Sequence, residues 1–467
     1  MLSICDTHPT RTCAGLHRRE LLKVGALGLG GMLGLPQWLQ ARAASETAGM
    51  IRDRSVVLLF LQGGPSHIEF FDPKMSAPSE IRSTTGEIET RHPGITFGGT
   101  FPRLAAMADQ FSIVRSYGSG NSGHTYESVT TAGNPLKASM GAMYARVAGT
   151  NHPTTGMPTN VLVLPEAVKD GLKLDGNFET GALPTLTQPG ELGASYHAFN
   201  PAGGGPLKDA MEMKLSNTRL DDRRYLLNEL DRYRRSADKS DHFLAADRFQ
   251  QQAFDVITRG VAQAFDLSRE DQATREMYDT SKLFDDATTQ RFYDQRRSTN
   301  QLGKQMLLAR RLCEAGCGFV TVSDCGWDMH ANNNSPKFMA NLPPMAHQVD
   351  HAVAAFIEDV KRRGLSDKIL LIVTGEMGRS PRINNNGGRD HYGELTSLLL
   401  FGGGLKMGQV VGSTDHYAAK ATSEPSRPIN LLGTVFNSLF DVGKLRLQSN
   451  IPRDIATLSE AAPIVGV

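Results

Sequence analysis

One short segment of the chain, Gly326-Trp327-Asp328-Met329-His330, carries a carboxylate and an imidazole two residues apart. Both groups are ordinary ligands of zinc and related divalent ions, and at this spacing they can face the same side of an extended loop. Taken alone, the pair is better explained by an Asp328 that caps a helix and a His330 that hydrogen-bonds the backbone. The metal interpretation therefore depends on which other side chains join them.

A second polar group follows later in the chain, where Glu376 and Arg379 are succeeded by Arg389, Asp390 and His391. His391, Glu376 and Asp390 offer further imidazole and carboxylate ligands, and with them a divalent-metal site explains the residues as well as a helix cap does. The guanidinium groups of Arg379 and Arg389 suit a two-pronged grip on phosphate, sulfate or carboxylate. They suit an ion pair with Glu376 or Asp390 equally well, and the sequence leaves both roles open.

A third candidate is Ser122, in the run from Gly120 to His124 that precedes a predicted helix ending near Gly133. At a helix N-terminus the backbone N–H groups and the helix dipole are available to an anion. A metal that lowered the pKa of the Ser122 hydroxyl would make it a nucleophile. The simpler alternative is that Ser122 caps the helix, and for the serine alone this is the better explanation.

Six short apolar runs bounded by turn residues indicate buried strands, and these strands decide where the polar side chains meet. The polar segments follow directly on the runs that end near Leu61, Ser323 and Thr374. In open α/β sheets, ligands bind beyond the carboxyl ends of the strands. Three strand ends and one loop should therefore bring the carboxylates, imidazoles and arginines to one edge. The six runs are 55–61, 111–117, 160–164, 318–323, 369–374 and 396–401.

Helical patterns lie between some of these runs. The clearest spans 344–363, with apolar residues three and four apart and Gly364 as its C-terminal stop. Strands that alternate with helices predict an α/β fold with a largely parallel central sheet covered on both faces. From 207 to 285 the chain is charged and poor in strand formers, which indicates a helical insertion with helices at 223–235 and 247–265.

The chain begins with an export signal of the twin-arginine type. Arg18 and Arg19 precede an apolar run of 12 residues, 24–35, and a small-residue cleavage site. The run is too short for a membrane span, which needs about 20 residues. We therefore expect residues 1–43 to be removed during export by the twin-arginine machinery. The mature domain, residues 44–467, is then expected to work in the periplasm or outside the cell.

Composition limits the partners of the mature chain. The full sequence holds 50 basic and 49 acidic residues, and without residues 1–43 the counts are 45 and 47, a net charge of −2. This balance gives no electrostatic footprint for nucleic acid, and no further apolar run approaches a membrane span. Cys313, Cys317 and Cys325 remain, and an odd, clustered trio is not a disulfide framework. Cys313 lies on the apolar stripe of a predicted helix, so we assign it to the core.

The polar segments belong to a longer set of motifs: Gly63-Gly64-Pro65-Ser66, Phe71-Asp72-Pro73-Lys74, Leu308-Ala309-Arg310-Arg311-Leu312, Gly326-Trp327-Asp328-Met329-His330, Gly375-Glu376-Met377-Gly378-Arg379-Ser380-Pro381, Gly388-Arg389-Asp390-His391 and Gly402-Gly403-Gly404. In this order they resemble an exported bacterial family known as domain of unknown function 1501, over nearly the whole mature chain. That family is related to the sulfatase and alkaline-phosphatase superfamily. The resemblance therefore implies an alkaline-phosphatase-like, three-layer α/β/α sandwich.

The resemblance also implies chemistry at two metal sites beside a Ser, Thr or modified Cys nucleophile, with transfer of phosphoryl or sulfuryl groups. It places Asp328, His330 and His391 at one metal site, although the Asp–His spacing in the superfamily is usually wider. The segment from Ser122 to His124 is similar to the nucleophile segment of the phosphoglycerate mutases in this superfamily. The expected nucleophile is Ser122 or a bound water, and His124 is an expected catalytic residue.

The second metal site departs from the superfamily pattern. The superfamily has an aspartate at the end of the first strand, where this chain has Gln62. It has Asp-His after a later strand, where this chain has Glu376-Met377. Glutamate can bind a metal, but methionine is a poor ligand for hard or borderline ions. Nearby residues that could compensate are Glu69, Asp72 and His67.

Two functions follow from these observations. One is a metal-dependent hydrolase of sulfate or phosphate esters, acting on a small molecule or a glycan, in which Arg379 neutralises the equatorial oxygens of the transferred group. The other is a non-catalytic binding protein, for a glycan or a protein ligand, that kept the fold with a degraded metal site. The expected cofactor is a divalent metal ion, and the ligand set does not distinguish zinc, calcium and manganese.

Overall fold

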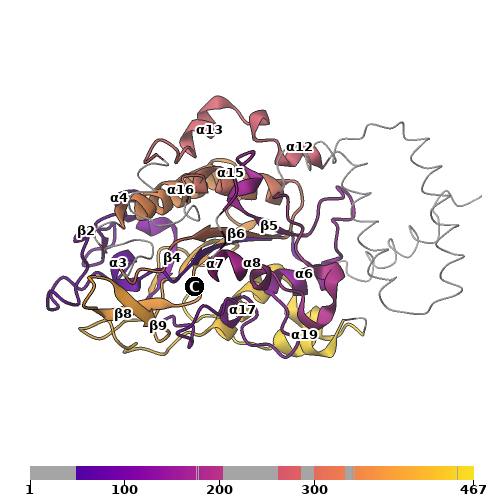
Figure 1. The fold of residues 1–467 in the computed structure, drawn as a ribbon. Helices are drawn as coiled ribbons and strands as arrows, with labels where there is room; N and C mark the ends of the chain where they lie inside the picture. Colours follow the sequence, from indigo (N-terminus) through magenta and orange to yellow (C-terminus); the bar gives the residue numbers. More distant parts are fainter. Residues whose placement is uncertain are drawn as a thin grey trace, which may run out of the picture. The chain divides into compact units, whose positions relative to one another are not determined.

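The computed structural model describes residues 49–174, 176, 178–202, 261–285, 299–331, 339, 342–449 and 451–467. All of them belong to the unit Gly49–Val467 (Figure 1). The predicted export signal, the helix predicted at 223–235 and most of the helix predicted at 247–265 lie outside the described residues.

A seven-stranded sheet forms the centre of this unit, in the order β11-β4-β10-β7-β1-β6-β5. The neighbours β7-β1, β1-β6, β6-β5 and β11-β4 are parallel, whereas β10 is antiparallel to both β7 and β4. All six predicted strands are present, and the prediction of a largely parallel sheet is confirmed. The strands are β1 (Ser55–Gln62), β4 (Ser112–Val114), β5 (Asn160–Val163), β6 (Phe319–Cys325), β7 (Ile369–Thr374), β10 (Leu399–Gly402) and β11 (Val410–Val411).

The central strand β1 shows why the sheet is covered on both faces. Seven of its eight residues are buried, and successive side chains point to opposite faces because a strand has a period of two. Its side chains alternate between two apolar clusters, with Val57, Leu59 and Leu61 in one and Val56, Leu58 and Phe60 in the other. A strand buried on both faces has a continuous apolar sequence, which is the pattern of this run.

Two long helices cover one face and two others cover the opposite face. The helices α15 (Leu302–Glu314) and α16 (Pro343–Arg362) pack with the first cluster, and α6 (Met140–Ala148) and α17 (Pro428–Leu439) pack with the second. Figure 1 shows α15 and α16 on one side of β5 and β6, with α6 and α17 on the other. The predicted α/β/α sandwich is therefore confirmed. The C-terminus of α16 is followed by Gly364 at φ 69°, a left-handed conformation that stops a helix, as predicted.

Shorter elements surround the sheet. They are the strand pairs β2 (Glu87–Glu89) with β3 (Thr96–Gly98) and β8 (Gly378–Ile383) with β9 (Arg389–Tyr392), and the helices α3 (His67–Phe70), α4 (Pro102–Ala106), α5 (Glu127–Thr130), α7 (Phe178–Gly181), α8 (Leu183–Leu186), α12 (Ala262–Phe265), α13 (Gln272–Met277), α18 (Val442–Arg446) and α19 (Arg453–Leu458). Of the predicted insertion, the part at 261–285 is described, and it contains α12 and α13. Cys313, Cys317 and Cys325 are buried free thiols, and Cys313 packs in the core as expected. Within the described ranges, no helix is long and apolar enough to cross a membrane.

The buried carboxyl of Asp324, near the end of β6, should make the stability of the folded protein depend on pH. Burial raises the pKa of its carboxyl to about 7, although a hydrogen bond from Trp327 Nε1 (2.8 Å) acts in the opposite direction. Between pH 4 and 7 the folded state therefore holds a proton that the unfolded state releases, so this group lowers stability as the pH rises through that window. Asp324→Asn cannot ionise and still accepts from Trp327. We expect it to exceed the wild type by about 2–4 kcal/mol in unfolding free energy at pH 8.

The measurement is urea denaturation of both proteins at pH 4.5 and pH 8. The advantage of Asp324→Asn should shrink towards zero at pH 4.5, where the wild-type carboxyl is protonated in the folded state. An equal difference at the two pH values would show that ionisation of Asp324 is not its cause.

Candidate metal site

The carboxyl ends of three neighbouring strands supply the polar loops, as the sequence predicts. β7, β1 and β6 lie side by side in parallel, so the segments that follow Thr374, Gln62 and Cys325 emerge at one edge. The hairpin β8-β9 follows β7 and pairs Arg379 with His391. This arrangement brings the residues predicted from separate segments into contact.

Three side chains meet closely enough to share one metal ion. The ligand atoms of His124, Asp328 and His391 all lie within 4.8 Å of one another, and we call these three residues the His–Asp–His cluster. Asp328 Oδ1 lies 3.3 Å from His391 Nε2 and 3.5 Å from His124 Nε2. His330 Nε2 lies 3.2 Å from the same oxygen. Two imidazoles and a carboxylate, with a third imidazole beside them, are a donor set that fits zinc and related divalent ions.

The electrostatics of the cluster favour a positive charge at its centre. Burial opposes ionisation of Asp328, but hydrogen bonds from His124, His330 and His391 and the charge of Arg379 hold its pKa far below the usual range. Burial likewise opposes protonation of His124, yet its contacts with Asp328 and Glu376 raise its pKa to about 9. A site that stabilises an imidazolium in this way also stabilises a bound cation, which would take the place of that proton.

Glu376 lies behind His124 rather than in the cluster. Its carboxylate is fully buried, and Oε1 lies 2.9 Å from His124 Nδ1 and accepts a 2.9 Å hydrogen bond from the backbone N–H of Gly63. A carboxylate on the far nitrogen of a histidine fixes the ring and makes it a stronger ligand. The sequence predicted Glu376 as a ligand, and in the structure its carboxylate instead contacts His124 on the side away from Asp328.

Asp390 holds a similar place behind His330. Its Oδ1 lies 3.2 Å from His330 Nδ1 and 2.9 Å from the side-chain nitrogen of Asn384, and its side chain is 63% exposed. Asp390 was also predicted as a ligand. Its contacts place it on the solvent side of His330, so it orients that imidazole.

Arg379 points inward, away from solvent. Its side chain is fully buried, and Nη2 donates to Asp328 Oδ1 at 2.5 Å and to the carbonyl of Gly63. Nε donates to the carbonyl of Gly64 at 3.2 Å, and Nη1 to that of Arg389 at 3.3 Å. The predicted grip on substrate oxygens does not agree with these contacts, because every nitrogen of the guanidinium already donates within the protein. Its ion-pair partner is Asp328, and neither Glu376 nor Asp390.

Ser122 reaches the cluster through its backbone. Its carbonyl lies 2.9 Å from His391 Nδ1, and because a carbonyl only accepts, Nδ1 carries the proton and Nε2 is left as the ligand atom. The prediction that Ser122 begins a helix is wrong, since α5 starts at Glu127 and its N-cap is Tyr126. Ser122 therefore neither caps this helix nor sits at its dipole. Its exposed side chain remains the predicted nucleophile.

Glu179 is a buried residue of this region that the sequence did not reveal. It lies on α7, and its Oε1 accepts a 3.3 Å hydrogen bond from the backbone N–H of Gly326. A Cβ on Gly63, whose φ is 108°, would stand 2.3 Å from Asp328 N and 2.7 Å from Glu179 Oε1. Only glycine fits there. The segment around Glu179 is rich in glycine and shows no periodicity, so nothing in it singles out this carboxylate. The single signal in the sequence was the Gly63-Gly64 pair at a strand end, which indicates that other groups approach the backbone closely there.

The residues at the second expected metal site are engaged with one another. The oxygen of the Gln62 amide accepts from Ser323 Oγ and, at 3.1 Å, from Cys325 Sγ, and Met377 is fully buried. These groups do not fit a second divalent ion. The residues that might have compensated have other partners: Glu69 pairs with Arg389, Asp72 with Lys74 and Arg115, and His67 bonds the carbonyl of Ala418.

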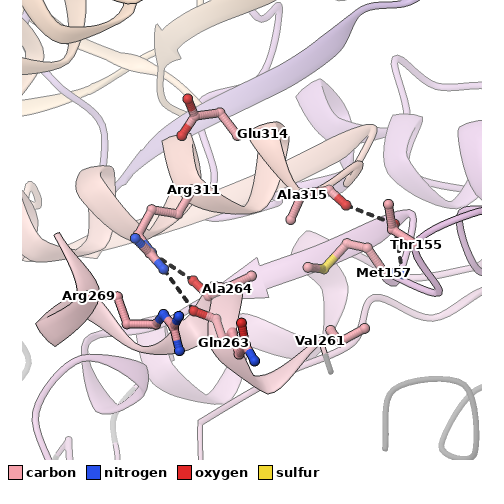
Figure 2. Close-up of a pocket in the computed structure, with 9 residues that line it drawn as sticks. All are labelled: Thr155, Met157, Val261, Gln263, Ala264, Arg269, Arg311, Glu314 and Ala315. Carbon is pink, nitrogen blue, oxygen red and sulfur yellow. Dashed lines mark hydrogen bonds between the residues drawn. The ribbon is translucent and has the colours of Figure 1, made fainter. Parts of the chain in front are cut away.

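A pocket of about 360 Å³ lies away from the cluster (Figure 2). Met157 and Ala315 in its wall precede β5 and β6, so it opens at the amino ends of those strands, whereas the cluster lies beyond the carboxyl ends. Figure 2 shows Arg311 reaching across it to the backbone of Gln263 and Ala264. It contains none of the predicted site residues.

Comparison with known proteins identifies a family. The family described as "Protein of unknown function (DUF1501)" matches residues 53–445. No curated protein matches the sequence. Similar solved structures include Ps i-CgsB in complex with k-i-k-neocarrahexaose (10% identity, 88% of this chain and 77% of that chain, TM-score 0.35) and the phosphonate monoester hydrolase SpPMH from Silicibacter pomeroyi (12%, 82% and 73%, 0.35). A third is the PsFucS1 sulfatase from Pseudoalteromonas sp. (13%, 81% and 69%, 0.27). At TM-scores this low we draw no argument from these likenesses. The match over residues 53–445 shows that the chain belongs to the family DUF1501.

Proposed function

We propose that this protein is an exported, metal-dependent hydrolase of sulfate or phosphate esters. The observation that carries the proposal is the His–Asp–His cluster at the carboxyl edge of the sheet. Each ligand of the cluster has a partner that fixes it: Glu376 for His124, Arg379 for Asp328 and the Ser122 carbonyl for His391. Ordered ligands with ordered partners are typical of metal sites rather than of chance contacts between polar side chains.

In this proposal the three residues of the cluster hold one divalent ion, with His330 beside it. Such an ion polarises an ester oxygen or lowers the pKa of a bound hydroxyl or water. The exposed hydroxyl of Ser122 is the proposed nucleophile, and its backbone carbonyl sets the tautomer of His391. Arg379 keeps Asp328 ionised and in place, so it acts as a positioning residue and not as a clamp on the substrate.

Export belongs to the same proposal. The paired arginines Arg18 and Arg19 with the apolar run after them indicate the twin-arginine pathway, which carries folded proteins. A protein that folds before export can bind its metal in the cytoplasm, and the partly buried cluster would then retain it. The mature protein is proposed to act in the periplasm or outside the cell.

The test is a metal assay on protein exported through its own signal and purified from the periplasm. We expect about one equivalent of divalent metal per chain, together with turnover of p-nitrophenyl sulfate or p-nitrophenyl phosphate that a chelator abolishes and added metal restores. Recovery of the protein only from the cytoplasm would contradict export. Protein without metal and without turnover would contradict the hydrolase.

A second candidate function is a binding protein that kept the fold and lost the chemistry. The observation that favours it is the second expected metal site, where Gln62 and Met377 replace ligands. Metal at full occupancy without turnover of either ester would support this candidate over the hydrolase.

A further inference from the structure

A surface loop, residues 414–421, is held in one conformation by its own hydrogen bonds. An isolated bridge joins Thr414 to Ala421, and the N–H of Asp415 donates to the Lys420 carbonyl at 2.9 Å. Inside the loop, Asp415 Oδ1 accepts from the backbone N–H groups of Tyr417 (3.2 Å) and Ala419 (2.8 Å). We call this segment the 414–421 loop. Because the loop is already ordered, ligand binding would cost it little further conformational entropy.

The loop is also anchored to the neighbourhood of the metal site. Ala418 is fully buried, and its carbonyl accepts a 2.9 Å hydrogen bond from His67 Nε2. The carbonyl of Ala419 accepts from the hydroxyl of Tyr392, the residue that follows His391 in β9. Ala418 has φ 50°, a left-handed conformation that is unfavourable for an alanine. Strain that the surrounding contacts maintain is found preferentially where a loop has a binding task.

The tip of the loop presents an aromatic ring to solvent. Tyr417 is 49% exposed, and no other Phe, Tyr or Trp whose burial the structure describes is exposed to this degree. Its ring stands edge-on to the ring of His416, with centroids 5.0 Å apart and planes at 69°, which restricts its orientation. Lys420 is exposed at the side of the same loop. The loop thus combines an oriented aromatic surface with the ammonium of Lys420 and the imidazole of His416, while the carboxylate of Asp415 is bonded to the backbone N–H groups of the loop.

We propose that the 414–421 loop binds a sugar ring of an anionic glycan, and that it thereby sets the substrate class of the neighbouring site. The C–H groups of one face of a pyranose pack on an aromatic ring, which presents an apolar and slightly negative face to them. Lys420 and His416 complement sulfate or phosphate substituents on the same glycan. This inference rests on the proposed function, because it takes an esterified glycan to be the substrate of the proposed hydrolase.

The distance from the loop to the cluster suits an oligosaccharide. His391 and Tyr392 are adjacent in the chain, and the Tyr392 hydroxyl contacts Ala419, two residues from Tyr417. Covalent geometry then limits the separation of the His391 and Tyr417 Cα atoms to roughly 22 Å. A glycan of several units spans this distance, so one ring can rest on Tyr417 while an ester on another unit reaches the cluster.

The test measures binding of carrageenan and chondroitin sulfate hexasaccharides, and of their desulfated forms, to the full exported protein by titration calorimetry. We expect the wild type to bind a sulfated probe more tightly than its desulfated form. Tyr417→Ala should weaken that binding about tenfold, whereas Tyr417→Phe, which keeps the ring, should retain it. Leu447→Ala, which removes a side chain that is 84% exposed outside the loop, is the control and should bind as the wild type does. Circular dichroism of each variant reports that it is folded.

The outcomes separate the inference from the proposed function. A wild type that hydrolyses p-nitrophenyl sulfate or phosphate but binds neither hexasaccharide overturns the inference and leaves the hydrolase standing. Equal binding by wild type and Tyr417→Ala also overturns it, and equal binding of sulfated and desulfated probes overturns the anionic part. Binding that depends on the Tyr417 ring, in a protein that has no metal and no turnover, supports the loop as a glycan site and contradicts the hydrolase.

Discussion

Replacement of Asp328 by alanine is expected to remove the metal and the hydrolysis together and to destabilise the fold. Asp328 Oδ1 contacts the three histidines and Arg379, so no other carboxylate can take over its contacts at the centre of the site. The loss of an outer partner of a metal ligand costs 10- to 100-fold in affinity or activity in general, so the loss of the ligand itself should cost at least about a hundredfold. Arg379, fully buried, would lose its one carboxylate partner, at a cost of about 3–5 kcal/mol.

Two matched variants divide this effect into its parts. Asp390→Ala removes a carboxylate that contacts the outer side of His330 and the amide of Asn384 and is 63% exposed, so it should leave stability within about 1 kcal/mol of the wild type and retain most of the metal. The double variant Asp328→Ala, Arg379→Met removes both members of the buried pair. It should recover much of the lost stability while the metal stays absent. Metal content by mass spectrometry and urea denaturation give the two readouts, and a metal-replete Asp328→Ala protein would contradict the cluster as the site.

The polar edge of the sheet was predictable because the carboxyl ends of neighbouring parallel strands lie at the same edge of the sheet. The buried runs that became β1, β6 and β7 are continuous and apolar, and all three ends lie at one edge once the strands are parallel. Asp328, His330 and His391 were named from this rule and from the family resemblance, and the structure brings them together. Their role as ligands remains a prediction.

The partners behind these residues were not predictable, because they depend on side-chain directions that no spacing encodes. Glu376 and Asp390 have the chemistry of ligands, and only the geometry shows that each faces the far nitrogen of a histidine. His124 entered the prediction as a catalytic residue beside Ser122, and the structure also brings it into the cluster. The buried Glu179 comes from a glycine-rich segment in which no pattern distinguishes one carboxylate from another.

The roles of the arginines could not be predicted either, since a guanidinium that binds a substrate at the surface and one that forms a buried ion pair belong to the same residue type. Arg379 and Arg389 were both open to either role, and both are fully buried. Arg389 pairs with Glu69 at 3.0 Å, and neither residue belongs to the cluster. Arg310 belongs to a motif that carried the family resemblance but suggested no chemistry. In the structure its ion pairs connect the helices of one layer.

Replacement of Arg310 by methionine is expected to lower the unfolding free energy by about 3–5 kcal/mol and to leave the cluster intact. Arg310 lies on α15 with no exposed surface, and Nε donates to Asp359 Oδ2 on α16 at 2.8 Å. The same guanidinium pairs with Glu270 at 2.9 Å and Glu314 at 2.6 Å. Methionine fills a similar volume, but it leaves the fully buried carboxylate of Asp359 with the Tyr278 hydroxyl and the arginines at the solvent side.

The matched control is Arg362→Met, because Arg362 also donates to Asp359, at 2.9 Å, from a side chain that is 55% exposed. Solvent screens such a pair, so its loss should cost about 1 kcal/mol or less. Urea denaturation compares the two variants, and metal content per folded chain should equal that of the wild type in both, since neither arginine contacts the His–Asp–His cluster. Equal destabilisation by the two changes would show that burial of Arg310 is not what makes its pairing with Asp359 important. Metal loss in Arg310→Met alone would instead connect the α15–α16 layer to the site. The connection would run through β6, which α15 covers and which ends at Cys325, five residues before His330.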